Sequence, residues 1–271
     1  MNKFNKCCIV ILTAFLVFAC NDSKPVNYVE IQKRINIIQQ IYDKGETKRA
    51  FSLSQKLLNE YPSEPIVKVA YLTTQLQLYK IENEKDTKLI EESLSGLNQA
   101  YDNLSKNPVI PKDALMQMRL GYAMLLKDFG YNKRAISEFK KHYDQNFDFV
   151  MQIGLGIVVV QYAEALSATV QLEEARSKYA QQQKIIGDEF YLIYNMIKLE
   201  SENGYFDKAL AIADNYLEKH PYDPDIAFEK CKAYKGLSLF EESKSCFEEL
   251  SSKIGSDDPL FKEVTERLNS L

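Results

Sequence analysis

The six residues 204–209 have the sequence GYFDKA, and related stretches occur 34 residues before and after them. These are VQLEEA at 170–175 and SLFEES at 238–243. Each ends on a small residue, and in two of the three an aromatic residue, Tyr179 or Phe247, follows four positions later. A 34-residue period matches one helix–turn–helix unit, which cannot bury its apolar face alone and stacks on its neighbours. The spacing predicts an all-α array of stacked helix pairs.

The same pattern continues upstream in KGETKRA at 44–50 and GYNKRA at 130–135, and Pro62 and Pro221 stand where helices must end. Together these positions resemble the tetratricopeptide repeat. The resemblance implies a right-handed superhelical array of about six helix pairs over 29–257, followed by a capping helix over 258–271. It assigns close helix packing to the small residues and groove filling to the aromatic ones, namely Ala50, Ala135, Ala175, Ala209, Ser243, Phe139, Tyr179 and Phe247.

The second unit of this array is irregular. Helices are expected over 66–79 and 89–104, with the charged stretch IENEKD at 81–86 between them. Such an insertion is either part of a longer helix pair or a functional elaboration, because insertions in repeat arrays map to loops on one face. We favour the longer helix pair.

The N-terminal residues predict an export signal. A short basic start precedes an apolar run from Cys7 to Phe18, too short to span a membrane comfortably, and Ala19-Cys20 follows it. VFAC at 17–20 resembles a bacterial lipobox, which implies a signal peptide over 1–19, lipidation of Cys20 and a tether over 20–28. An ordinary signal peptide or an uncleaved anchor is the alternative. Because Asn21 follows the cysteine, we expect the outer membrane, facing the periplasm, rather than the inner membrane.

Two further cysteines, Cys231 and Cys246, flank a predicted turn at 236–239 almost symmetrically. In an antiparallel helix pair such positions can face each other, and an exported protein meets an oxidising compartment. The sequence therefore allows either a disulfide or two buried free thiols.

The composition argues against several chemistries. The net charge of −4 lacks the basic footprint of a nucleic-acid-binding protein. His142 and His220 belong to no recognised metal-binding motif, and GLG at 154–156 lacks the third glycine of a dinucleotide fingerprint. Adjacent acids on a helix diverge by about 100°, so pairs such as Glu241-Glu242 do not converge on a substrate. We expect no enzyme, no metal, no cofactor and no nucleic-acid partner.

The resemblance also implies a partner-binding groove, because the first helices of successive tetratricopeptide units line a concave surface. A peptide or helix of another protein is the expected occupant, and no small-molecule substrate is expected. Exposed aromatic residues among polar groups are typical of such surfaces. The predicted groove residues are Leu120, Met124, Lys127, Gln161, Glu164, Tyr191, Tyr194, Asn195, Lys198, Phe228 and Lys232.

The leading functional hypothesis is a non-enzymatic, lipid-anchored scaffold that binds a protein partner and helps to assemble or localise an envelope complex. In plan it is similar to the tetratricopeptide lipoproteins that act as pilotins for pili and secretion channels. One alternative is a periplasmic adaptor that regulates cell-wall enzymes or proteases. Another is a ligand-binding or enzymatic groove, which requires an enclosed cavity with convergent polar groups.

Overall fold

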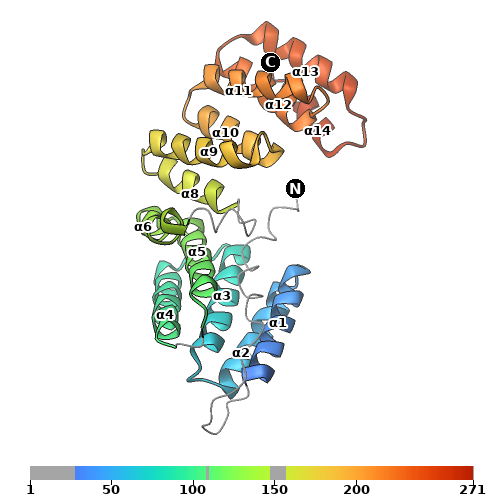
Figure 1. The fold of residues 1–271 in the computed structure, drawn as a ribbon. Helices are drawn as coiled ribbons and strands as arrows, with labels where there is room; N and C mark the ends of the chain where they lie inside the picture. The colour runs from blue at the N-terminus through green and yellow to red at the C-terminus, as the bar shows by residue number, and fades with distance from the viewer. Residues whose placement is uncertain (1–27, 108–109, 147–156, 271) are drawn as a thin grey trace. The chain divides into compact units, whose positions relative to one another are not determined.

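The computed structural model describes residues 28–107, 110–146 and 157–270, and every regular element in them is a helix (Figure 1). The predicted signal peptide, Cys20, nearly all of the tether and the GLG stretch lie outside the described residues. No helix in the described ranges combines the length and the apolar character needed to cross a membrane. The chain divides into two compact units, Met1–Ala165 and Leu166–Leu271.

The first unit consists of consecutive antiparallel helices. Its elements are α1 (Tyr28–Asp43), α2 (Thr47–Glu60), α3 (Pro65–Glu82), α4 (Thr87–Ser105), α5 (Lys112–Asp128), α6 (Asn132–His142), the 3₁₀ helix η3 (Asp144–Asn146) and α8 (Ile157–Ser167), which ends just beyond the unit boundary. The apolar stripe of α1 is buried as its spacing predicts, with Ile31 and Ile35 inaccessible to solvent. The irregular stretch forms the long pair α3 and α4, and the side chain of Asp86 caps α4 by accepting from the backbone N–H of Lys88 and Leu89.

The second unit contains α9 (Leu172–Ile186), α10 (Phe190–Glu202), α11 (Phe206–Lys219), α12 (Pro224–Gly236), α13 (Phe240–Lys253) and α14 (Pro259–Leu268). One apolar cluster joins α10, α11 and α12 around Ile197 and Ala213. Another joins α12, α13 and α14 around Phe228, Phe247 and Val264. The predicted capping helix is α14, which closes the second cluster.

One turn geometry recurs between the helices of each pair. A residue with positive φ follows α1, α3, α5, α8, α10 and α12, at Gly45, Asn83, Gly130, Val170, Gly204 and Ser238. The residue after it donates its backbone N–H to a carbonyl five positions back, as Tyr205 does to Glu200 at 2.8 Å. This hydrogen bond satisfies a carbonyl that the helix end leaves unpaired. This hydrogen bond recurs in all six turns, which explains why they share one backbone geometry although their residues differ.

The predicted packing residues are in the core. Ala50, Ala135, Ala175, Ala209 and Ser243 are fully buried. Ser243 occupies the position that is alanine in the other four of these units. Its buried hydroxyl is not left without a partner, because it donates a hydrogen bond to the carbonyl oxygen of Cys231 at 2.9 Å. The aromatic positions Phe139, Tyr179 and Phe247 are also buried, so the all-helical repeat array predicted from the sequence is confirmed.

Candidate protein-interaction surface

The part of the predicted groove on α5 is wrong for its two apolar residues. Leu120 and Met124 are 0% and 2% exposed, so neither is available to a partner. Every residue from Met118 to Leu126 is buried. The repeat pattern assigns one face of α5 to the groove, but the middle of this helix is buried on every side, including the charged Arg119, which pairs with Asp102 of α4.

The polar groove residues of the first unit contact one another. Lys127 of α5 forms an ion pair with Glu164 of α8, and Gln161 donates from its side-chain nitrogen to the same carboxylate at 3.3 Å. All three side chains are partly exposed. They connect α5 to α8 and leave a small polar surface with no aromatic anchor among the predicted residues.

On α10 of the second unit, the side chains of Tyr191 and Asn195 form hydrogen bonds to neighbouring residues of the same unit. The phenol oxygen of Tyr191 accepts a hydrogen bond from the side chain of the buried Gln182 of α9 at 2.6 Å. The side chain of Asn195 donates to the backbone oxygen of Tyr191 at 2.6 Å. Tyr191 therefore helps to hold α9 against α10, and we assign it a structural role in addition to its place on the predicted groove.

Tyr194, one turn further along α10, is half-buried and lies beside the apolar cluster of α10–α12. Its ring centroid is 5.9 Å from that of Phe190 and 5.8 Å from the ammonium of Lys198. Lys198 also lies 3.6 Å from the carboxylate of Glu202. Tyr194 thus presents an aromatic ring whose face already attracts a cation.

The α12 part of the predicted groove is partly wrong. Phe228 is only 5% exposed, because its ring packs edge-on against Phe247 of α13. Lys232 remains partly exposed, with its ammonium 5.5 Å from the Phe228 ring and 2.9 Å from the carboxylate of the buried Glu229. Phe228 therefore belongs to the core, and of the two predicted groove residues on α12 only Lys232 lies at the surface.

Carboxylates on α10, α12 and α14 act electrostatically on Tyr194, and the groove prediction omitted two of them, Asp225 and Glu263. Burial and the negative charges of Glu229, Asp225, Glu263 and Glu202 raise the pKa of Tyr194 to about 12. Desolvation and the charges of neighbouring acids, including Asp223, Asp258 and Glu229, raise the pKa of Asp225 as well. Burial is the largest cause of both shifts, and the acidic neighbours on α10, α12 and α14 add to it.

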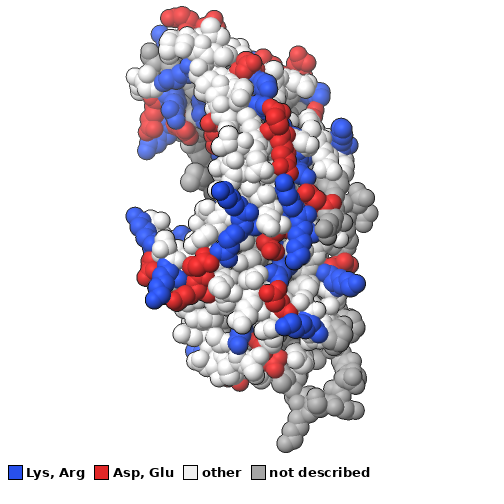
Figure 2. Space-filling view, turned by 90° about the vertical axis from the view of Figure 1, so that its left-hand side faces the viewer, with Lys and Arg blue, Asp and Glu red and all other residues white. Residues whose placement is uncertain are grey.

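Charge is distributed unequally along the sequence, and this signal was available without a structure. Residues 166–271 contain thirteen Lys and Arg and twenty Asp and Glu, which gives −7. Residues 29–165 contain eighteen basic and seventeen acidic residues, which gives +1. On the face drawn in Figure 2, charges of both signs are interspersed, as expected where ion pairs such as Arg134–Glu91 join neighbouring helices.

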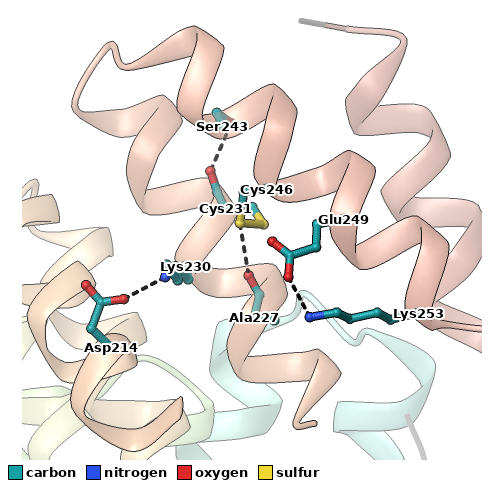
Figure 3. The surroundings of a disulfide bond; sticks show 8 residues. All are labelled: Asp214, Ala227, Lys230, Cys231, Ser243, Cys246, Glu249 and Lys253. Carbon is teal, nitrogen blue, oxygen red and sulfur yellow. Dashed lines mark hydrogen bonds and ion pairs between the residues drawn. A yellow bond between two sulfur atoms is a disulfide. The ribbon is translucent and has the colours of Figure 1, made fainter. Parts of the chain in front are cut away.

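The second unit also contains a disulfide between Cys231 of α12 and Cys246 of α13 (Figure 3), with the two Cα atoms 5.4 Å apart. The two cysteines lie opposite each other across the helix pair, so of the two arrangements that the sequence allows the structure has the disulfide. Nearby, Lys230 pairs with Asp214 of α11 at 2.7 Å and Lys253 with Glu249 at 2.5 Å. The disulfide fixes α13 to the helix that carries Asp225 and Lys232.

The described residues contain no group of three or more His, Cys, Asp or Glu side chains arranged to hold a metal ion. A shallow apolar depression of about 480 Å³ lies between α2 and α3 in the first unit, lined by Leu58, Asn59, Pro62, Lys68, Tyr71 and Leu72. It is open to solvent and contains one charged side chain, so it lacks the convergent polar groups of a ligand site.

No protein-family model matches the sequence, and no curated protein matches it. Among solved structures, a tetratricopeptide repeat protein from Parabacteroides merdae matches with a TM-score of 0.54 and 12% sequence identity, over 88% of this chain and 98% of that one. The TPR domain of P58(IPK) matches with a TM-score of 0.35 and 15% identity, over 90% of this chain and 66% of that one. At this identity the first likeness concerns the fold alone. The chain has an all-helical, tetratricopeptide-like repeat fold.

Proposed function

We propose that this protein is a non-enzymatic, lipid-anchored scaffold that binds a protein partner and helps to assemble or localise a complex of the cell envelope, of the pilus or secretion type. The exposed surface of α10, α12 and α14 is the observation that carries the proposal. There Tyr194 presents a half-buried ring among charged side chains from three helices. Tyrosine surrounded by polar groups is enriched at protein interfaces.

The anchor rests on the N-terminal sequence. An apolar run followed by Ala19-Cys20 favours export and lipidation, with the protein held on the periplasmic side of the outer membrane. From Cys20 to Tyr28 an extended chain spans at most about 30 Å. A folded domain on so short a tether acts by raising the local concentration of its partner at the membrane surface.

A photo-crosslinking experiment tests the partner. A photoreactive amino acid replaces Tyr194 in the full chain expressed in its native cells, and a matched variant carries it at the exposed Lys244 of α13. We expect one discrete protein adduct from position 194 and none from position 244. Pilus or secretion-channel subunits in that adduct support the proposal, whereas a cell-wall enzyme or a protease supports the adaptor alternative. No adduct from position 194, or the same adduct from both positions, would contradict a docking surface on α10.

The anchor has a separate test. Cys20→Ser removes the only thiol at the predicted lipidation position, so we expect the protein to move from the membrane fraction to the soluble fraction. A Cys7→Ser variant, altered within the apolar run, is the control and stays in the membrane fraction. If the Cys20→Ser protein remains bound to membranes, the lipid anchor is wrong.

A further inference from the structure

We propose that the surface of α10, α12 and α14 binds a partner segment rich in lysine and arginine. This inference rests on the proposed function, because it names the chemistry of the partner that the same surface would take. The surface is defined by Tyr194 and Lys198 of α10, Asp225 and Lys232 of α12, and Glu263 of α14.

The charge of the second unit supplies the first argument. With a net charge of −7 over residues 166–271, the unit attracts cations over a distance of about one Debye length, roughly 8–10 Å in physiological salt. Residues 29–165 of the first unit, at +1, have no comparable negative field. A cationic segment is therefore drawn to the second unit in preference to the first.

The ion pairs on this surface supply the second argument. Each of its lysines forms an ion pair within its own helix, Lys198 with Glu202 and Lys232 with Glu229. Asp225 forms no ion pair with any basic side chain in the described residues. Glu263 lies 3.7 Å from Arg267, and both side chains are about half exposed, so this pair contributes little. Two carboxylates thus remain to receive cations from outside.

The chemistry of Tyr194 supplies the third argument. The ammonium of Lys198 lies 5.8 Å from the centroid of the Tyr194 ring, which shows that the ring can accept a cation. Guanidinium and ammonium groups bind well where an aromatic face adjoins carboxylates, because cation–π attraction and ion pairing add. An acidic or purely apolar segment would meet repulsion or leave the carboxylates without partners.

A binding measurement on the full chain in detergent tests this proposal. The probe is a short fluorescent peptide of alternating lysine and alanine, and the comparison probe has glutamate in place of lysine. The Asp225→Asn/Glu263→Gln variant removes two charges from the surface. The matched control, Glu241→Gln/Glu242→Gln, removes two exposed charges from the first turn of α13, so that both variants have the same net charge. Thermal unfolding of each variant checks that the fold is retained.

We expect the lysine peptide to bind and the glutamate peptide not to bind. The Asp225→Asn/Glu263→Gln variant should weaken binding of the lysine peptide about tenfold, and the α13 control less than about twofold. Tyr194→Leu should also weaken binding, whereas Tyr194→Phe keeps the aromatic face and should not. If both charge variants lose the same affinity for the lysine peptide, net charge alone explains the binding and the proposal is overturned. Equal binding of the two peptides, or no binding of the lysine peptide, would also overturn it.

The two proposals can fail independently. A partner crosslinked at position 194 through a neutral or acidic segment would leave the scaffold function intact and contradict the cationic segment. Selective binding of the lysine peptide without any crosslinked protein in cells would support the chemistry of the surface and contradict the scaffold function.

Discussion

Arg176 of α9 and Glu200 of α10 form a bidentate ion pair, with Nε and Nη2 of the arginine 2.7 and 2.5 Å from the two carboxylate oxygens. The side chain of Glu200 is 6% exposed and that of Arg176 is 17% exposed. The guanidinium also lies 4.5 Å from the ring centroid of Tyr205, at the end of the turn that joins α10 to α11. One arginine thus joins two helices and a turn of the second unit.

Removing only one partner of this pair should be costly. Arg176→Met leaves a buried carboxylate without its cation, and we expect the free energy of unfolding to fall by about 2–4 kcal/mol. The double variant Arg176→Met/Glu200→Met leaves no uncompensated charge and should regain at least half of that loss. Urea unfolding of the three proteins measures both effects. A double variant no more stable than the single one would show that the carboxylate is not the source of the penalty.

The disulfide should stabilise the last helix pair. It closes a loop with a sequence separation of 15, and a loop of that length restricts the unfolded chain by about 3 kcal/mol. Reduction should therefore lower the thermal unfolding temperature and accelerate amide hydrogen exchange in α12 and α13. The Cys231→Ala/Cys246→Ala variant should unfold at the same temperature as the reduced protein, and adding reductant should not change that temperature. A reductant effect that persists in this variant would locate the sensitivity elsewhere.

Replacing the left-handed turn residue between α8 and α9 with glycine should stabilise the protein. Val170 has a φ of 64° and is 92% exposed, so a β-branched residue occupies a conformation that costs about 1–2 kcal/mol without any packing in return. Allowing for the greater entropy of an unfolded glycine, Val170→Gly should raise the free energy of unfolding by about 0.5–1 kcal/mol.

The matched exchange is Gly204→Val at the corresponding turn, where φ is 80° and an added Cβ would meet no atom within 4 Å. Only the backbone conformation opposes valine there, so by the same balance of strain and chain entropy this variant should lose about 0.5–1 kcal/mol. Chemical denaturation compares the two. A stabilising Gly204→Val, or a destabilising Val170→Gly, would refute the turn argument.

Acid should weaken the junction between α9 and α11. Asp188 accepts hydrogen bonds from the ammonium of Lys219 at 2.6 Å and from the side chain of Gln183 at 2.8 Å, and these contacts lower the pKa of its carboxyl. A lowered folded pKa gives stability that is present above the unfolded value and is lost as pH falls through the folded one. Near about pH 7, Asp188→Asn should therefore be less stable than the natural protein by up to about 1 kcal/mol.

That difference should vanish once the pH is below the lowered pKa, because the natural carboxyl is then neutral as well. Denaturant unfolding at neutral and strongly acidic pH measures the change. Glu218→Gln, an exposed acid beside Lys219, is the control and should follow the natural protein throughout. A constant deficit of Asp188→Asn at all pH values would indicate lost packing rather than lost charge.

The sequence was sufficient for the repeat architecture because each unit carries its own local signals. A small residue at Ala175, Ala209 or Ser243 permits close helix packing, and prolines such as Pro62 mark helix ends, so no long-range information is needed. The C-terminal helix α14 was located by a different local signal, the spacing of its apolar residues on one face. The disulfide required more, since Cys231 and Cys246 meet only if their helices pair in the correct register.

The surface was harder to predict because exposure depends on everything that covers a helix. The repeat pattern gives the direction in which Leu120, Met124 and Phe228 point, but not the packing that buries them. Conversely, Asp225 and Glu263 belong to different helices, and neither resembles a site residue in its local sequence. Tyr194 packs against the cluster that contains Ile226, next to Asp225. Val264, next to Glu263, shares a cluster with Phe228. The repeat pattern does not encode this packing of α14 against α12. The excess of acids after residue 166 was the one signal that pointed to these two acids.

The disulfide also determines how the C-terminal end of the array comes apart. The helix pair at the end of a stacked array has a neighbour on one side only, so local opening begins there. Unravelling from the C-terminus can release α14 and the last turns of α13, but it cannot separate α13 from α12 beyond Cys246. A protease that cuts the exposed turn at 236–239 leaves two fragments still joined through Cys231. The helix that carries Asp225 and Lys232 therefore keeps its neighbour even after the backbone has been cleaved.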